Sequence, residues 1–419
     1  MFDDIKIFRK PRLTLILIGI ISFIKIRVIG IFSPFELFAS LFFLFQVISN
    51  SDFKIKIFEN KIYKCFKNLL ILWSICQLVS DIVNQSTISD SLKGVLAPLL
   101  IILSLRLLLI LKTYFNYQYF IEDLLIGMSL CQLYYKIYEF SNFQTSIKFG
   151  LGFYSCLILF SLIKDKKINF ILNLLFICLY LIYGVRSSLM ISLAFFLTRV
   201  FQKKYIKSVI TSNIFFNIRN GIIKYFAFIL ILLLLSPISR SFNNFLVILR
   251  PNDQRINILK SQSEGNFFSA RLEYFSFFDS FKDAPILGHG SWPYDEEYKY
   301  YLLSQRGDPE TNNKTDREII KNSKENPQTP KGIPYIPSHS FIQQNIVWAG
   351  IFASFFFFYA LNLNLFLLSN SFINDSMRLL LISFTYDMFF SPIGFNRFYI
   401  PFACLTIIYS FISINKKIN

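Results

Sequence analysis

The sequence predicts an all-α polytopic membrane protein with about 12 transmembrane helices and a large, partly helical extracytoplasmic loop. Hydrophobic residues make up 54% of the chain and charged residues only 16%, whereas a soluble domain carries about 25% charged residues. The charges are missing from one apolar run after another, so lipid is the expected solvent. The first run is kept as a span because no small-residue cleavage site follows it.

A hydrocarbon core about 30 Å thick requires ~20 helical residues. In the first expected helix, Lys25 and Arg27 reach the membrane interface from its end. The seventh and eighth helices are short and close together, and they form either a hairpin or a broken element. The expected helices cover residues 12–30, 33–49, 66–83, 92–111, 119–138, 146–163, 168–185, 187–202, 221–237, 341–363, 377–393 and 398–415.

The distribution of Lys and Arg among the short loops predicts the orientation. Basic residues concentrate in the loops expected on the cytoplasmic side, such as 54–67, 164–167 and 199–219, and are scarce in the opposite short loops. Both termini are then cytoplasmic. The net charge of +17 is thus a topology signal that fits anionic lipid headgroups. Without any nucleic-acid-binding motif, the expected partner is the lipid bilayer and not nucleic acid.

A long polar segment divides the chain into three parts: transmembrane helices 1–9 in residues 1–238, an extracytoplasmic loop in 239–340, and transmembrane helices 10–12 in 341–419. Ser269 is the expected N-cap of a loop helix that ends before Pro285. This helix carries Tyr274, Phe277, Phe278 and Phe281 on one face and rests on the membrane interface or on the helix bundle. Gly288 and Gly290 then form a tight turn. Residues 308–331 are polar and are expected to form a mobile flap or a surface excursion.

Both histidines, His289 and His339, lie in this loop. Histidine can transfer protons near neutral pH, although a structural role is also open for each. The six cysteines show neither a disulfide framework nor zinc-ligand spacing. The acidic run Asp295-Glu296-Glu297 is expected to be solvated. No metal and no cofactor is expected.

Several motifs in this chain resemble those of the O-antigen ligase and O-antigen polymerase superfamily of lipid-linked glycan transferases. They are Arg271, Pro285-Ile286-Leu287-Gly288-His289-Gly290, His339-Ser340-Phe341, Ala349-Gly350-Ile351 and Gly184-Val185-Arg186-Ser187-Ser188-Leu189. The sequence departs from the family pattern at three positions. Ser340 stands where the family usually has Asn, Val185 stands where it has Ser, and His289 replaces a small apolar residue.

This resemblance implies a GT-C-like fold in the inner (cytoplasmic) membrane with an active site facing the periplasm. It implies a glycosyltransferase that moves an oligosaccharide or polysaccharide from an undecaprenyl-pyrophosphate donor to a hydroxyl of a glycan or lipid A-core acceptor. The reaction is expected to be inverting and metal-independent. Arg186 and Arg271 are expected to bind the pyrophosphate, because guanidinium groups bind phosphate bidentately. His339 is the expected proton acceptor, and Tyr274 and His289 are further candidates for substrate binding.

Other functions remain open. Ligase, polymerase and transfer of glycan to protein use the same donor and differ in the acceptor. A transporter or flippase of lipid-linked saccharides is the main alternative, although such proteins often have internal repeats that this sequence lacks. The only strong charge expected near the middle of a span is Arg106. A scaffold without activity is a third possibility.

Overall fold

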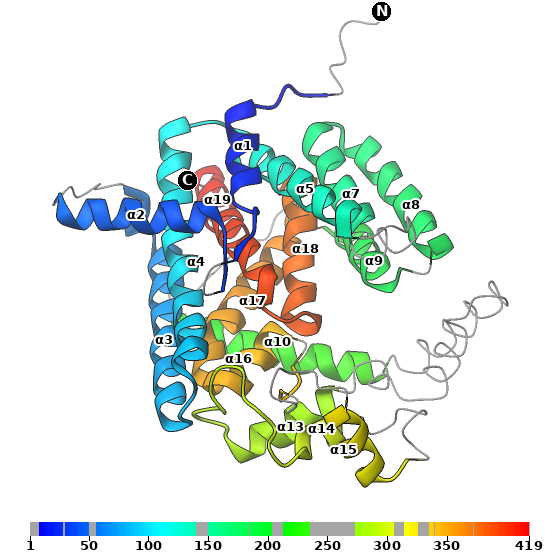
Figure 1. Cartoon of the computed structure of the whole chain (residues 1–419). Helices are drawn as coiled ribbons and strands as arrows, with labels where there is room; N and C mark the ends of the chain where they lie inside the picture. Colours follow the sequence, from blue (N-terminus) through cyan, green and yellow to red (C-terminus); the bar gives the residue numbers. More distant parts are fainter. Residues whose placement is uncertain are drawn as a thin grey trace, which may run out of the picture.

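The computed structural model describes residues 8–27, 30–49, 56–139, 150–183, 185–202, 213–234, 273–305, 314–325, 335–338, 340–371 and 373–418. Within these ranges the chain is helical apart from short 3-10 segments, loops and one two-stranded hairpin (Figure 1). The helices are α1 Leu13–Ile21, α2 Pro34–Ile48, α3 Lys61–Val83, α4 Ile88–Phe115, α5 Phe120–Glu139, α7 Leu151–Leu162, α8 Lys166–Tyr183, α9 Arg186–Val200, α10 Ile214–Leu234, α13 Glu273–Asp283, α14 Lys299–Ser304, α15 Asp316–Glu325, α16 Phe341–Ala349, α17 Phe355–Leu368, α18 Asp375–Phe390 and α19 Ile400–Ile418. The 3-10 segments are η1 Lys56–Glu59, η3 Ile351–Ser354 and η4 Gly394–Tyr399.

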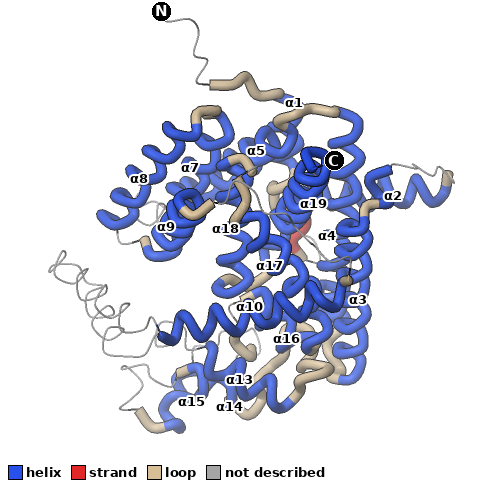
Figure 2. The backbone as a smooth tube through the Cα atoms, turned by 180° about the vertical axis from the view of Figure 1, so that it is seen from behind, coloured by secondary structure: helices blue, strands red, loops and turns tan. Residues whose placement is uncertain are grey.

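Six helical segments are long and apolar enough to cross a membrane: Lys61–Val83, Ile88–Phe115, Lys166–Tyr183, Ile214–Ile231, Ile351–Leu368 and Arg397–Ile414. These are the features of an all-α membrane protein, which confirms the predicted class in its coarser form. Three further apolar helices, Pro34–Ile48, Leu151–Leu162 and Ser187–Val200, are shorter. Both α2 and α10 run across the direction of α3 and α4 (Figures 1 and 2). The helix expected at 33–49 is present as α2, which is one of the shorter helices, so a span here stays a prediction.

The expected continuous span at 12–30 is wrong, because α1 ends at Ile21. Its 9 residues rise only about 14 Å. The chain then turns into an antiparallel hairpin in which Ile26 pairs with Phe32. The backbone N–H of Lys25 donates a hydrogen bond of 3.0 Å to the hydroxyl of Tyr135. This contact with α5 fixes the extended conformation after the helix.

The expected continuous helix at 341–363 is broken at Gly350. This residue has φ +77°, which is in the left-handed region that only glycine adopts readily. Helix α16 ends at Ala349, and the chain restarts as η3 and α17. A Cβ at Gly350 would lie 1.7 Å from the carbonyl oxygen of Ile286. The close approach of the loop backbone therefore requires glycine here and explains the break.

The core is centred on α17, α18 and α19, which lie between α3 and α4 on one side and α7 to α9 on the other (Figure 1). Phenylalanine rings fill the core. The ring centroids of Phe356 and Phe357 in α17 lie 6.3 and 5.4 Å, respectively, from that of Trp73 in α3. The side chain of Arg378 in α18 is fully buried. Its guanidinium donates to the carbonyls of Leu368 (2.6 Å) and Asn370 (2.7 Å), so the charge is solvated by backbone dipoles.

The extracytoplasmic loop of the prediction is partly folded within the described residues. Helices α13, α14 and α15 lie at the end of the molecule opposite to the C-terminus (Figure 1). Helix α13 packs on the helix bundle, with Tyr274 and Phe277 buried and Phe278 40% exposed. Of the two expected resting places, the membrane interface and the bundle, the structure has the bundle. The expectation of a loose flap at 308–331 is wrong for Asp316–Glu325, which forms α15 and buries Ile319.

Candidate active site

Two segments that were singled out in the sequence, 285–290 and 349–351, lie against each other. The N–H groups of His289 and Gly290 donate to the carbonyls of Val347 (2.7 Å) and Trp348 (3.0 Å), and the N–H of Ile351 donates to Pro285 (3.0 Å). Gly288 and Gly290 have φ values of +71° and +84°, so the expected glycine turn is confirmed. The backbone of the turn is thus hydrogen-bonded to the chain at the break between α16 and α17.

The C-terminal end of α3 holds this turn from the other side. The carboxylate of Asp81, which is 2% exposed, accepts hydrogen bonds from the N–H (2.5 Å) and the hydroxyl (2.9 Å) of Ser291. The hydroxyl of Ser80 accepts from the Gly290 N–H (3.0 Å) and donates to the Trp348 carbonyl (2.7 Å). Buried polar groups that are paired in this way fix one backbone geometry.

Two predicted substrate-binding residues serve to dock the loop. The Nε2 atom of His289 lies 2.9 Å from the carbonyl oxygen of Ser280, and its ring packs edge-on against Tyr300. Tyr274 is 2% exposed, and its hydroxyl donates a 2.6 Å hydrogen bond to the carbonyl of Phe389. Neither side chain lines the cavity described next, and their role in binding stays a prediction.

A cavity of about 450 Å³ lies at the C-terminal end of α18. Its polar wall carries hydroxyls and one carboxylate, and its apolar wall comes from the end of α1 and from α5, α7, α9 and α18. The lining residues are Phe23, Met128, Gly150, Phe153, Tyr154, Ser187, Ser188, Ile191, Leu380, Ser383, Tyr386, Asp387, Phe390, Ser391, Pro392 and Tyr399. The volume falls within the range of about 300–1,000 Å³ that is typical of ligand pockets.

Asp387 is the charged group in this wall. Its carboxylate accepts a short hydrogen bond from the hydroxyl of Tyr399, which comes from the 3-10 turn before α19. The hydroxyls of Tyr154 and Tyr386 belong to the same lining. A carboxylate held by a phenol can accept or position a proton on a bound hydroxyl group.

The N-terminus of α9 opens onto the same cavity. Arg186 is the first residue of this helix, whose N-cap Val185 makes no side-chain hydrogen bond to the first turn. The first N–H groups of a helix have no partner within it, and the helix dipole favours an anion there. Ser187 and Ser188 of this first turn line the cavity. The Arg186 side chain lies outside the described residues.

Two side chains of the loop segment bind the last carbonyls of α18, close to the cavity. The hydroxyl of Ser340 donates a 2.6 Å hydrogen bond to the carbonyl of Met388, and Tyr274 donates to the next carbonyl, that of Phe389. These carbonyls belong to the last turn, which lacks helical partners. Arg271 and His339 lie outside the described residues, so the predicted proximity of Arg186, Arg271 and His339 stays a prediction.

Asp387 and Tyr399 are not among the site residues predicted from the sequence. Asp387 is the only acidic residue within the expected span 377–393. An ionisable residue inside an apolar span is a functional candidate by itself, so this signal could have found it. Naming Arg106 as the only strong charge near mid-span was therefore wrong. The guanidinium of Arg106 lies over the ring of Phe58, 4.9 Å from its centroid.

Comparison with known proteins does not decide between the candidate functions. No family model, no curated protein and no solved structure matches this chain. Within the described residues, no three His, Cys, Asp or Glu side chains are grouped so that they could hold a metal ion. The function therefore has to be argued from the cavity.

Proposed function

We propose that this protein is a glycosyltransferase that moves a glycan from an undecaprenyl-pyrophosphate donor to an acceptor hydroxyl, as in the O-antigen ligase and polymerase superfamily. The observation that carries the proposal is a convergence at the C-terminal end of α18. Ser187 and Ser188 share a cavity with Asp387, and Ser340 bonds to the neighbouring Met388. Arg186 and His339 are the chain neighbours of Ser187 and Ser340.

The cavity has suitable parts for a lipid pyrophosphate. Its apolar wall, which includes Phe153, Ile191 and Phe390, suits the first isoprene units. The N-terminus of α9 and the guanidinium of Arg186 supply partial and full positive charge for the departing pyrophosphate. Arg271 is the second proposed cation.

The acceptor hydroxyl attacks the anomeric carbon as the bond from this carbon to the pyrophosphate oxygen breaks. In the proposed reaction, His339 takes the proton from the hydroxyl, and the configuration at the anomeric carbon inverts. The Asp387 carboxylate, held by Tyr399, accepts a hydrogen bond from a sugar hydroxyl and so orients the ring. Positioning of this kind lowers the barrier because reactants are aligned before the reaction.

The break at Gly350 is the observation that favours the alternative, a transporter or flippase for lipid-linked saccharides, because transporters often use discontinuous helices. In transporters, however, the broken backbone lines a substrate cavity. Here, residues 285–290 cover the break, and their backbone hydrogen-bonds to the chain on both sides of Gly350. This difference favours the transferase.

The direct experiment uses purified protein in detergent with purified undecaprenyl-pyrophosphate glycan and candidate acceptors. The proposal predicts new glycan linkage together with release of undecaprenyl pyrophosphate, without added divalent metal. The product distinguishes the acceptors: polymerised repeat units indicate a polymerase and glycan on lipid A-core indicates a ligase. Movement of intact lipid-linked glycan across a proteoliposome membrane, without linkage, would instead support the transporter.

A further inference from the structure

A second, smaller cavity of about 180 Å³ lies at the opposite end of α18. It is lined by Arg9, by residues of α5, α7 and α8, and by the N-terminal end of α18, including Asp375. Twelve residues separate Asp375 from Asp387, which corresponds to about 18 Å of helix. Lys164 precedes α8 and Lys166 begins it, and both belong to the basic segment 164–167, which is expected on the cytoplasmic side. The cavity is therefore distinct from the candidate active site.

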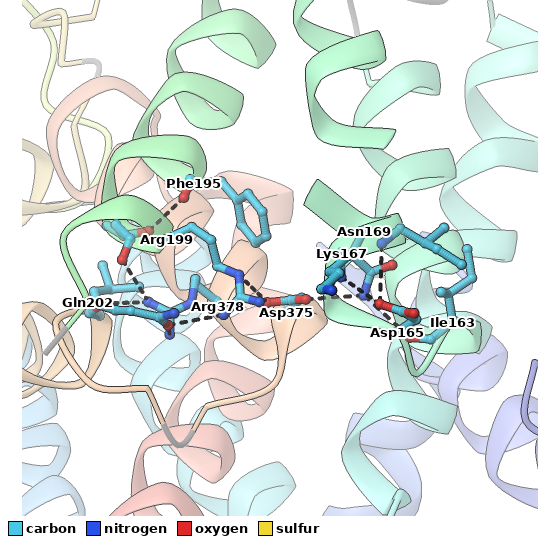
Figure 3. A network of polar contacts seen from close by, with 12 residues as sticks. Ile163, Asp165, Lys167, Asn169, Phe195, Arg199, Gln202, Asp375 and Arg378 are labelled. Atoms are coloured by element: carbon cyan, nitrogen blue, oxygen red, sulfur yellow. Dashed lines mark hydrogen bonds and ion pairs between the residues drawn. The ribbon is translucent and has the colours of Figure 1, made fainter. Parts of the chain in front are cut away.

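A polar network ties the helices around this cavity together, and Figure 3 shows the part of it around Asp375. Arg9 forms a buried ion pair with Asp123. The amide nitrogen of Asn169 donates a 3.1 Å hydrogen bond to Asp375, and Arg199 approaches the other carboxylate oxygen of Asp375 at 3.6 Å. The amide of Asn374 donates to the carboxylate of Glu122. These contacts hold two carboxylates at the cavity wall.

Several buried acceptors of this wall have no hydrogen-bond partner. They include Oε2 of Glu122 and Oδ1 of Asn169, whereas Oδ1 of Asp375 has only the 3.6 Å ion pair with Arg199. The three residues are 3%, 2% and 3% exposed, respectively. Leaving a buried acceptor unpaired is costly, especially on a charged group. The deep part of the cavity thus carries these acceptors beside one unpaired nitrogen of a cation, Nη2 of Arg9. The exposed side chains of Lys164 and Lys166 make its entrance cationic.

We propose that this cavity binds a primary ammonium–phosphate group, as found in the head group of phosphatidylethanolamine. The three N–H donors of the ammonium pair with Glu122, Asn169 and Asp375, and the phosphate lies at Lys164 and Lys166. In this lipid the ammonium is the terminal group and the phosphate is next to the glycerol. The head group therefore enters ammonium first and leaves the acyl chains outside.

The chemistry separates this ligand from related lipids. Phosphatidylcholine has a quaternary ammonium without N–H donors, and phosphatidylglycerol has no cation to match the carboxylate of Glu122. Phosphatidylcholine therefore cannot donate a hydrogen bond to the buried acceptors, and the hydroxyls of phosphatidylglycerol can donate but bring no positive charge. Soluble phosphoethanolamine carries the same two groups, so it tests whether the acyl chains are needed.

The experiment measures the melting temperature of delipidated full-length protein in detergent as a function of added phosphatidylethanolamine, phosphatidylcholine, phosphatidylglycerol or soluble phosphoethanolamine. A ligand that binds only the folded state raises the melting temperature with concentration. We expect a saturable rise with phosphatidylethanolamine and none with the other two lipids. A rise with soluble phosphoethanolamine alone keeps the site and assigns it to a soluble ligand.

Variants locate the binding. Glu122→Gln keeps the shape but places an amide opposite the ammonium, so affinity falls about tenfold or more, as for loss of a hydrogen bond to a charged group. Lys164→Glu is exposed and tests the phosphate contact without disturbing the core. Glu296→Gln, an exposed carboxylate in the loop, is the matched control and leaves binding unchanged. Equal shifts with all three lipids, no shift with any ligand, or unchanged affinity in both cavity variants overturns the proposal.

Discussion

The hydroxyl of Ser340 donates a 2.6 Å hydrogen bond to the carbonyl of Met388. This contact joins the end of the long polar segment 239–340 to the helix that carries Asp387. It brings Ser340 next to the last turn of α18, whose residues Asp387 and Phe390 line the cavity at the N-terminus of α9. The proposed mechanism depends on this junction.

Asp387→Asn removes the carboxylate charge but keeps the side-chain size. We expect the rate of glycan transfer to fall by about 100-fold, which is the loss that misplacement of the reacting groups can cause. Purified variant and wild type are compared with the same lipid-linked donor. Asp279→Asn on the outer face of α13 is the matched control. A wild-type rate in Asp387→Asn removes this residue from the mechanism.

Arg186→Ala removes a full positive charge beside the N-terminus of α9. Loss of one charge-stabilising group typically lowers the rate by about 100-fold to 1,000-fold, and we expect a loss of this size. Arg186→Lys keeps the charge and should retain more activity than Ala. Both variants are first checked for normal levels in the membrane. Similar activity in Ala and wild type would exclude a role in pyrophosphate binding.

Gly350→Ala tests the break between α16 and α17. The substituted residue would have to keep φ at +77°, and its Cβ would collide with Ile286. We expect a destabilisation of at least about 1–3 kcal/mol from backbone strain, measured as a lower melting temperature. Gly30→Ala is the control, because the nearest atom to its Cβ lies 3.6 Å away. Equal melting temperatures for both variants would show that the loop does not dock as described.

The contact between α13 and α14 should weaken in acid. Hydrogen bonds from Lys299 and from Tyr300 lower the pKa of Asp283. A lowered folded-state pKa means that the contact stabilises the loop above the unfolded-state pKa of about 3.9 and is lost as pH falls through the folded value. We expect pepsin to cleave α13–α14 faster as pH falls from about 5 to about 2. Asp283→Asn should lack this acid-dependent step, and the same pH profile in both proteins would contradict the assignment.

The sequence predicted the helices best where apolar runs are long and uninterrupted. The runs at 66–83 and 92–111 fall within α3 and α4, because backbone groups in lipid must be paired within the helix. The break at Gly350 was missed because the run around it is apolar throughout. The cause is a tertiary contact with Ile286, which composition does not reveal. The hairpin after α1 was missed for the same reason, since Tyr135 of α5 helps to fix it.

The candidate site was predicted only in part. The glycine turn at 288–290 was predicted from the sequence, whereas its association with 349–351 became visible only in the structure. Tyr274 and His289 were expected to bind substrate, and in the structure the Tyr274 hydroxyl bonds to Phe389 of α18 while the His289 ring bonds to Ser280 within the loop. Aromatic and imidazole groups serve both purposes, and only the neighbours in space distinguish them. Asp387 was overlooked although its place in an apolar run was visible.

The central claim is that the lipid-linked donor binds in the cavity between α9 and α18. The most direct test places a photo-crosslinking amino acid at position 187 and irradiates the full-length protein with labelled undecaprenyl-pyrophosphate glycan. The control places it at position 114, where Tyr114 is 83% exposed at the far end of α4. The account predicts donor captured from position 187 and not from position 114. Equal capture at both positions, or none at position 187, would contradict it.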